Sequence, residues 1–234
     1  KPRVTIGIMQ PYFLPYIGYW QLLAACDRFV VYDNIEYTKK GWINRNRFLR
    51  NGAAVYFTVP LKHDADDLDV VQRAVSDTFD RAKMLRQFAD AYRRAPHFAT
   101  VYPLLEHIVL ANQTNLFEYL HHSIKTTADF LEISTSIVVS SAVPIDHSLR
   151  GQDKVLAICE TLGAQRYLNS IGGMALYPRD AFTARGIAIG FLQPHALVYP
   201  QFNGAFVPHL SILDVLMFNT RDRVRAMLGE FDVV

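Results

Sequence analysis

The sequence predicts an α/β fold whose mostly parallel sheet is built from both ends of the chain, with a helical insertion between them. Two observations carry this prediction. Short apolar runs alternate with helical stretches over the first 60 residues and again after residue 134, and apolar residues recur at spacings of three and four between about 79 and 131. We expect a Rossmann-like sheet in a single domain over residues 1–234.

The first 60 residues are expected to form a strand, a helix and two further strands. Residues 4–9 are an apolar run typical of a strand buried on both faces, and residues 18–26 supply a short helix. Residues 28–33 form the second strand, and so short a connection through one helix predicts a parallel βαβ unit. A further strand covers residues 54–61 and ends near Pro60.

The α/β alternation resumes after the helical region. We expect strands over residues 134–139, 166–169 and 187–192, and helices over residues 153–162, 178–184, 212–218 and 222–228. Gly163 and Gly186 follow two of these helices, as is typical of helix C-caps. In an open parallel sheet, ligands bind beyond the carboxyl ends of the strands, so we expect the site there.

The composition excludes several classes of protein. Half of the 234 residues are hydrophobic, a fifth are charged and the net charge is +2, which argues against disorder and against nucleic-acid binding through bulk charge. Cys26 and Cys159 lie in apolar stretches and are expected to be core residues of a protein in a reducing compartment. The first apolar run is too short for a signal peptide and no run could span a membrane, so we expect a cytoplasmic protein.

The first candidate site is the loop between the first strand and the first helix, residues 9–20. Gln10 offers a donor and an acceptor, Tyr12 and Tyr16 offer rings, and Gly18 at the helix start permits close approach of a ligand. Twelve of the 29 aromatic residues lie in the first 60 residues, several of them in loops or at helix starts. The alternative is that these rings only close the top of the core.

The second candidate site is the basic stretch that follows the second strand, residues 33–47. It holds four cations within nine residues, which suit phosphate oxygens, together with an indole that could stack on a base or sugar and two amides: Lys39, Lys40, Trp42, Asn44, Arg45, Asn46 and Arg47. The alternative is a solvated loop that pairs with the acidic residues at 64–69.

A third candidate site lies at the end of the strand over residues 166–169. Asn169 is followed by Gly172 and Gly173, which leave room for a ligand, although paired glycines also occur in ordinary turns. The spacing matches neither a dinucleotide-binding motif nor a P-loop.

The candidate acid–base residues are His195, His209 and Asp214, because a histidine near its ordinary pKa can transfer protons. His147 beside Asp146 is a further candidate, and each histidine alone is equally compatible with a structural role. We expect no metal site, because neither an H-E-x-x-H nor a C-x-x-C spacing occurs.

The same stretches resemble the WbqC-like family of bacterial proteins along essentially the whole chain. The segments that carry the resemblance are IGIMQPYFLPYIGYWQLL, VVYDNIEYTKKGWINRNR, ICETLGAQRYLNSIGGMALY and VYPQFNGAFVPHLSILDVLMFN. The last of these adds Gln201 to the expected substrate-binding residues. The resemblance implies a role in tailoring nucleotide-linked sugars or related small molecules for surface polysaccharide, O-antigen or natural products.

Two functions follow as hypotheses. The first is an enzyme that binds a phosphorylated or nucleotide-linked substrate and transfers an acyl or aminoacyl group to an amine, with His195 or His209 as the base. The second is a non-catalytic binding or scaffold protein that presents such an intermediate. The layout also resembles nucleotidylyltransferase-like folds, but Tyr16 and Tyr19 lie where their paired histidines would fall, which disfavours adenylation. The sequence identifies no cofactor and no oligomeric state.

Overall fold

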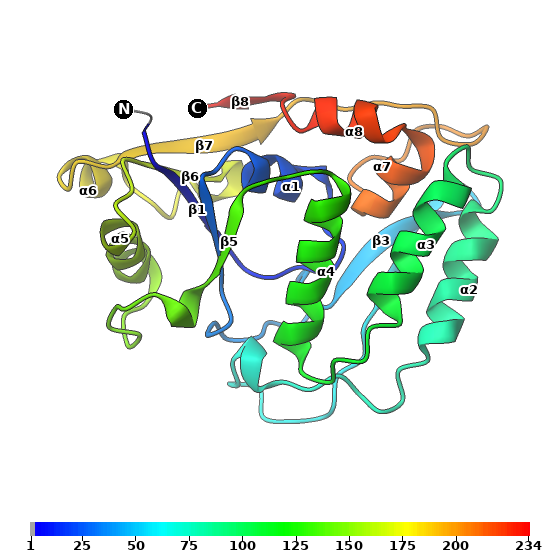
Figure 1. Ribbon diagram of the computed structural model, residues 1–234, viewed down its shortest axis with the longest axis horizontal. Helices are drawn as coiled ribbons and strands as arrows, with labels where there is room; N and C mark the ends of the chain where they lie inside the picture. Colours follow the sequence, from blue (N-terminus) through cyan, green and yellow to red (C-terminus); the bar gives the residue numbers. More distant parts are fainter. Residues whose placement is uncertain (1–2) are drawn as a thin grey trace.

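The fold is organised around a six-stranded sheet in the order β5-β2-β1-β6-β7-β8, seen in a computed structural model that describes residues 3–234 (Figure 1). Its strands are β1 (Thr5–Met9), β2 (Arg28–Val31), β5 (Ser136–Val139), β6 (Arg166–Ser170), β7 (Ala188–Pro194) and β8 (Phe231–Val233). The first five of these run parallel, whereas β8 pairs antiparallel with β7. The predicted α/β fold, with a mostly parallel sheet drawn from both chain ends, is therefore confirmed.

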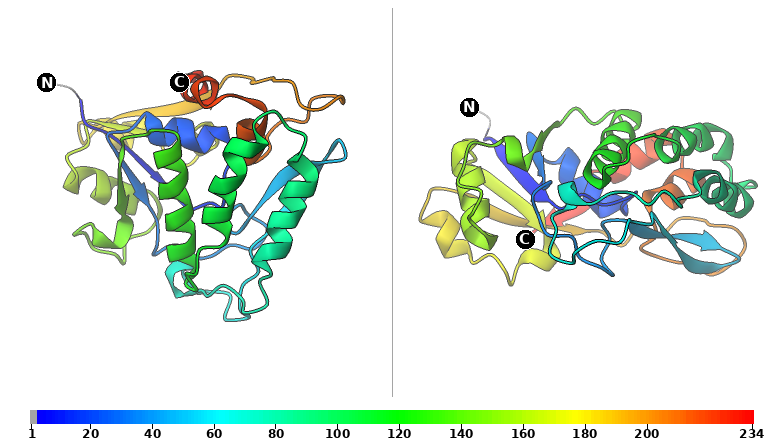
Figure 2. Two further views of the ribbon diagram at one scale, coloured as in Figure 1. Left: turned by 45° about the vertical axis from the view of Figure 1, so that its right-hand side comes forward. Right: turned by 90° about the horizontal axis from the view of Figure 1, so that it is seen from below.

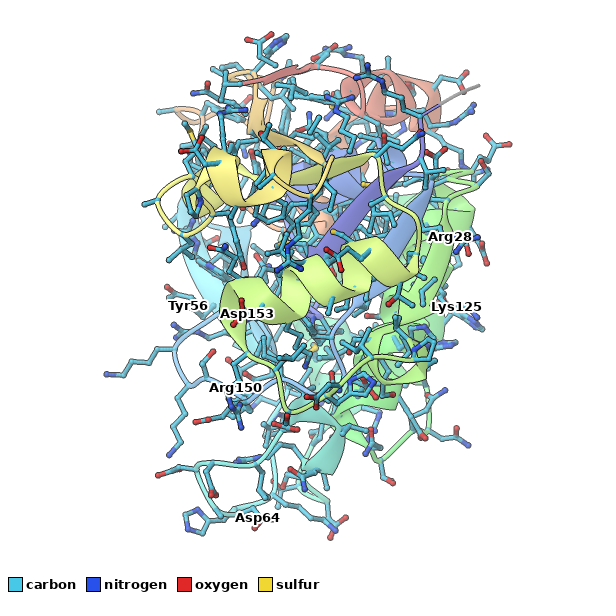
Figure 3. The ribbon with its side chains drawn as sticks, turned by 90° about the vertical axis from the view of Figure 1, so that its left-hand side faces the viewer. Arg28, Tyr56, Asp64, Lys125, Arg150 and Asp153 are labelled. Atoms are coloured by element: carbon cyan, nitrogen blue, oxygen red, sulfur yellow. The ribbon has the colours of Figure 1, made fainter. Side chains whose placement is uncertain are left out.

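Helices cover both faces of the sheet, because successive side chains of a strand point to opposite sides. In β2, Val30 belongs to the core under α5 (Gly151–Thr161) and α6 (Arg179–Thr183), the side seen in Figure 3. Phe29 and Val31 belong to the core on the other face. The helices of that second core are α1 (Ile17–Ala24), α7 (Ile212–Phe218) and α8 (Arg221–Met227).

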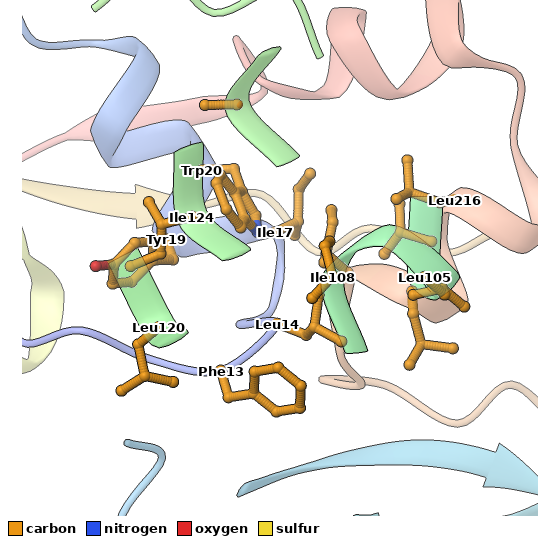
Figure 4. Close-up of a cluster of buried hydrophobic side chains, with 14 of the residues drawn as sticks. Phe13, Leu14, Ile17, Tyr19, Trp20, Leu105, Ile108, Leu120, Ile124 and Leu216 are labelled. Atoms are coloured by element: carbon orange, nitrogen blue, oxygen red, sulfur yellow. The ribbon is translucent and has the colours of Figure 1, made fainter. Parts of the chain in front are cut away.

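Three helices form the predicted helical region and extend the second core away from the sheet (Figure 2). They are α2 (Arg81–Tyr92), α3 (Phe98–Val109) and α4 (Leu116–Phe130). Asp80 and Asn115 cap α2 and α4 by accepting hydrogen bonds from backbone N–H groups of the first turn. Figure 4 shows apolar side chains of α3 and α4 around Phe13, Leu14 and Trp20, so this region packs directly on the α1 side of the core.

A β-hairpin separate from the main sheet corrects the reading of the basic stretch as a loop. Strand β3 (Arg45–Arg50) pairs antiparallel with β4 (Ala53–Thr58), and the turn residues Asn51 and Gly52 both have positive φ, 49° and 77°. This is the Asn-Gly turn that favours a tight hairpin. The charge pattern of residues 45–47 hid their alternating burial, so sequence analysis missed β3, and it also missed the short strand β8.

Two further expectations can be compared with the structure. Cys26 and Cys159 are free and buried, and burial raises the pKa of each thiol to about 12, as expected of core residues. Within residues 3–234, no helix is long and apolar enough to cross a membrane.

Candidate active site

A cleft with a volume of about 740 Å³ opens at the carboxyl ends of β1, β6 and β7. The chain leaves β1 towards β2 on one side, whereas β6 and β7 lie on the other side, so the cleft sits at the switch point of the sheet. Open α/β sheets bind their ligands at this place. Most side chains that line the cleft are apolar or aromatic, among them Met9, Tyr12, Tyr16, Trp42, Leu192, Leu197, Tyr199 and Phe206.

The first wall of the cleft is the loop after β1 together with the start of α1. The Gln10 carbonyl accepts a hydrogen bond from the Tyr19 hydroxyl at 2.9 Å, and the Pro15 carbonyl accepts one from Trp20 Nε1 at 3.0 Å. A Cβ at Gly18 would lie 2.5 Å from the Tyr16 ring, so glycine lets this ring lie over the helix start. These contacts fix the loop at the cleft.

The aromatic residues near the N-terminus divide between the cleft and the core. Tyr12 and Tyr16 line the cleft, and burial raises the pKa of both phenols. Phe13 is fully buried and Tyr37 is 8% exposed, both within the main core. These last two rings are therefore explained by core packing, which for Phe13 includes the Tyr119 ring of α4.

The second wall is the long irregular segment of residues 195–210, which connects β7 to α7. It contributes nine residues to the lining: His195, Ala196, Leu197, Val198, Tyr199, Phe206, Pro208, His209 and Leu210. Long loops without secondary structure of their own are commonly functional. We call residues 195–210 the cleft loop.

Two histidines of the cleft loop, His195 and His209, line the cavity. His195 Nε2 lies 3.1 Å from Asp232 Oδ1 of β8, and the His195 backbone N–H donates to the Glu230 carbonyl. His209 packs edge-on against the Tyr16 ring, with centroids 5.6 Å apart, and has a positive φ of 59°. The carboxylate of Asp232 can hold the His195 ring with Nδ1 free to accept a proton.

Arg47 brings a positive charge to the same cavity. Its guanidinium lies 5.5 Å from the centroid of the Trp42 ring and donates from Nη2 to the His209 carbonyl at 3.1 Å. The buried Nε atom has no hydrogen-bond partner among the described residues. Because Nε is buried, the outer nitrogens of the guanidinium are the donors that a ligand in the cleft can reach.

The other members of the basic stretch have different surroundings. Lys39 pairs with Asp66 of the acidic loop at 3.0 Å, with both side chains exposed. Lys40 has a positive φ of 62°, and Arg45 donates to its carbonyl while lying over the Tyr56 ring.

The two asparagines of that stretch are buried. The Asn44 amide accepts from the Tyr37 hydroxyl and donates to the Val59 carbonyl, so its contacts hold the hairpin in place. Asn46 lines the cleft and accepts from the Arg47 backbone N–H.

The glycine pair after β6 forms a single turn of 3₁₀ helix, Ile171–Gly173. A Cβ at Gly173 would lie 2.6 Å from Asn169 Nδ2, whereas Gly172 faces open space. The Asn169 side chain accepts from the backbone N–H of Ser170, and Ser170 lines the cleft. The turn therefore fixes one edge of the cavity.

Asp214 lies fully buried in α7, behind the wall of the cleft. Its carboxylate accepts hydrogen bonds from Tyr92 at 2.8 Å, Tyr199 at 2.6 Å and Gln201 at 2.8 Å. Burial raises the pKa of the carboxyl group although these three donors lower it. Of its partners, Tyr199 also lines the cleft.

The model of the WbqC-like protein family matches residues 10–226. The chain belongs to the WbqC-like family. It is also similar to the uncharacterized protein Rv1507c of Mycobacterium tuberculosis (strain ATCC 25618 / H37Rv), with 30% identity over 219 residues that cover 92% of this chain and 93% of that protein. The comparison with solved structures gives no match.

In this WbqC-like protein, the structure brings together residues from four distant segments. Tyr12, Tyr16 and Gly18 meet Trp42, Asn46 and Arg47, the turn after Asn169, and both His195 and His209 around one cavity, whereas Gln10 lies outside the lining and contacts Tyr19 through its carbonyl. Sequence analysis missed Asp232 and Tyr199: the first lies on an unpredicted strand, and in the segment VYPQFNGAFVPHLSILDVLMFN, which holds the second, the sequence indicates only Gln201, His209 and Asp214 as candidates. His147 lies elsewhere: its ring contacts Asn34 and the Val143 carbonyl.

Proposed function

We propose that this protein is an enzyme that transfers an acyl or aminoacyl group to the amine of a nucleotide-linked amino sugar or a related small molecule. The observation that carries this proposal is the cleft at the switch point, where two imidazoles and a guanidinium line a mostly apolar cavity. Membership of the WbqC-like family supports a role in tailoring nucleotide-linked sugars or related small molecules, as the resemblance implies.

Different parts of the cleft lining suit different parts of the proposed ligand. The apolar and aromatic walls suit an acyl group or the apolar face of a deoxygenated sugar, with Trp42 available for stacking. Arg47 contacts a phosphate oxygen through the outer nitrogens of its guanidinium, because this residue lines the cleft. Lys39 and Lys40, both exposed on the same basic stretch, attract the phosphorylated ligand from outside.

The chemistry needs one base. The amine nitrogen attacks the acyl carbonyl, a C–N bond forms, the bond to the leaving group breaks, and the nitrogen proton passes to an imidazole. His195 is the residue we assign, because Asp232 orients its ring and stabilises the imidazolium that forms. His209, which supports Arg47 through its carbonyl, is the second candidate for this role.

Purified protein incubated with nucleotide-linked amino sugars and a panel of acyl donors tests the proposal, with amide product followed by mass spectrometry. We expect His195→Ala to lower kcat by about 100-fold or more, the usual contribution of a general base. The exposed residue His63, which does not belong to the cleft lining, provides the control His63→Ala, which keeps activity. Tight ligand binding with no turnover by any donor would instead support a binding or scaffold protein.

A further inference from the structure

The cleft loop carries few backbone hydrogen bonds of its own and depends on side chains for its shape. Gln201 closes a turn within it, donating from Nε2 to the Val207 carbonyl at 3.0 Å and accepting from the Val207 N–H at 2.8 Å. The same Nε2 also donates to Asp214. Tyr199, two residues earlier, donates to the same carboxylate oxygen.

Asp214 holds the cleft loop against a separate part of the molecule. Its other oxygen accepts from Tyr92 at the end of α2, and the Tyr92 hydroxyl accepts from the Leu49 backbone N–H of β3. One fully buried carboxylate thus joins the cleft loop, the helical region and the hairpin.

We propose that Asp214 is a positioning residue, which sets the ligand affinity of the cleft by holding Tyr199 and Gln201 in the cleft wall. Tyr199 is the direct link, because one face of this residue lines the cavity while its hydroxyl is bound to Asp214. Its ring also packs against Phe206 of the same loop, with centroids 5.0 Å apart. This inference rests on the proposed function only in taking the cleft as the binding site.

Three hydrogen bonds to one carboxylate allow a matched comparison. Tyr199→Phe and Gln201→Met release the cleft loop, whereas Tyr92→Phe removes a donor from the same carboxylate and leaves both loop contacts in place. Tyr92→Phe also deprives the Leu49 N–H of its acceptor, so it should destabilise the fold at least as much as Tyr199→Phe. Loss of ligand affinity without a larger loss of stability therefore separates positioning from a merely structural role.

The probe is anilinonaphthalene sulfonate, whose apolar rings and single negative charge suit the cavity and Arg47. Its binding is followed by the rise of its own fluorescence, with both tryptophans of the parent protein unchanged. We expect Tyr199→Phe and Gln201→Met to weaken binding at least fivefold, and Tyr92→Phe to change it less than twofold, while thermal unfolding shows Tyr92→Phe to be no more stable than Tyr199→Phe. Equal losses for Tyr92→Phe and Tyr199→Phe, or no loss in any variant, would overturn the proposal.

Limited chymotrypsin digestion gives a second readout that needs no ligand. The cleft loop contains Leu197, Phe202 and Phe206 as cleavage sites, and because the bond after residue 199 precedes Pro200, Tyr199→Phe neither adds nor removes one. Cleavage within the loop, mapped by mass spectrometry, should accelerate several-fold in Tyr199→Phe and not in Tyr92→Phe. Unchanged cleavage rates in Tyr199→Phe and Gln201→Met contradict the positioning role, whatever the activity assays find.

Discussion

Two buried aspartates, Asp33 and Asp214, each connect distant segments of the chain through hydrogen bonds, but from different kinds of donor. Asp33 follows β2 and is 6% exposed; it accepts hydrogen bonds from the hydroxyls of Ser140 and Ser141 and from the Ser141 N–H, just after the neighbouring strand β5. Asp214 is fully buried and binds two phenols and an amide from different parts of the molecule. The two carboxyl groups differ in their pKa as a result.

Burial raises the pKa of both carboxyl groups, but the outcome depends on the donors. At Asp33 the two serine hydroxyls and the backbone N–H outweigh burial, so the pKa is lowered from its ordinary value. At Asp214, three donors do not outweigh deeper burial and the pKa is raised. The folded protein thus favours the charged form of the Asp33 carboxyl group and disfavours the charged form of the Asp214 carboxyl group.

The networks around the two residues also end differently. Around Asp33, Ser140 bonds to Asn34, and Asn34 bonds in turn to His147 and Lys154. His147 accepts from Asn34 at Nδ1 and donates from Nε2 to the Val143 carbonyl, which is a neutral tautomer with both nitrogens bonded. The hydrogen-bonded network of Asp33 therefore includes no residue that lines the cleft, whereas the network of Asp214 includes Tyr199, which does.

The largest effect that this comparison predicts is on stability. Asp214→Ala leaves two phenols and an amide buried without their acceptor, and we expect the free energy of unfolding to fall by about 3–5 kcal/mol. Asp33→Ala should cost about 1–3 kcal/mol, because the Ser140 hydroxyl keeps Asn34 as an acceptor. Urea unfolding of both variants measures the difference, and an equal or larger loss in Asp33→Ala contradicts it.

The pH dependence of stability distinguishes the two residues by sign. A lowered folded pKa, as at Asp33, gives stability that is present above the unfolded pKa of about 3.9 and is lost as the pH falls through the folded pKa. A raised folded pKa, as at Asp214, gives stability that is present below the unfolded pKa and is lost as the pH rises towards the folded value.

Asn substitutions should therefore change the acid limb in opposite directions. With unfolding measured from about pH 3 to pH 6, Asp33→Asn should flatten the rise of stability with pH below about pH 4, and Asp214→Asn should steepen it above that pH. Parallel curves for both variants and the parent protein would show that the two carboxyl groups titrate alike in the folded and unfolded states.

The sequence predicted the scaffold of both networks better than the networks themselves. The apolar runs of β1 and β2 and the spacing of apolar residues in α2 to α4 follow from burial alone, so they could be read directly. The cleft could be placed at the carboxyl ends of the strands for the same reason. Which strands are neighbours could not be read, because β6 pairs with β1 across more than 150 residues of chain.

The roles of individual side chains depended on such distant pairings. Arg47 and Lys39 carry the same charge eight residues apart, yet one lines the cleft and the other pairs with Asp66 at the surface. Asp214 was a candidate acid–base residue on its type and its neighbours. Its contact with Tyr92, 122 positions away, follows from the packing of α2 on α7 and from no local pattern.

The smallest effect is expected at Lys154, the buried cation of the Asp33 network. Its Nζ donates to the backbone and side-chain oxygens of Asn34 and lies 5.0 Å from the Tyr32 ring centroid, and burial lowers its pKa. Lys154→Met removes these hydrogen bonds together with the cost of burying the ammonium, so the two changes nearly cancel. We expect the free energy of unfolding to change by no more than about 1 kcal/mol in either direction.

Because the Asp33 network includes no residue that lines the cleft, Lys154→Met should also leave the affinity of the cleft for anilinonaphthalene sulfonate unchanged. Tyr199→Phe, in contrast, should weaken it. Both quantities can be measured on one preparation, by urea unfolding and by the fluorescence of the bound probe. A weakened probe affinity in Lys154→Met would mean that the end of β2 and the cleft are coupled, and the distinction between the two aspartate networks would then fail. Unchanged affinity with nearly unchanged stability leaves Asp214, of the two buried aspartates, as the one whose contacts shape the cleft.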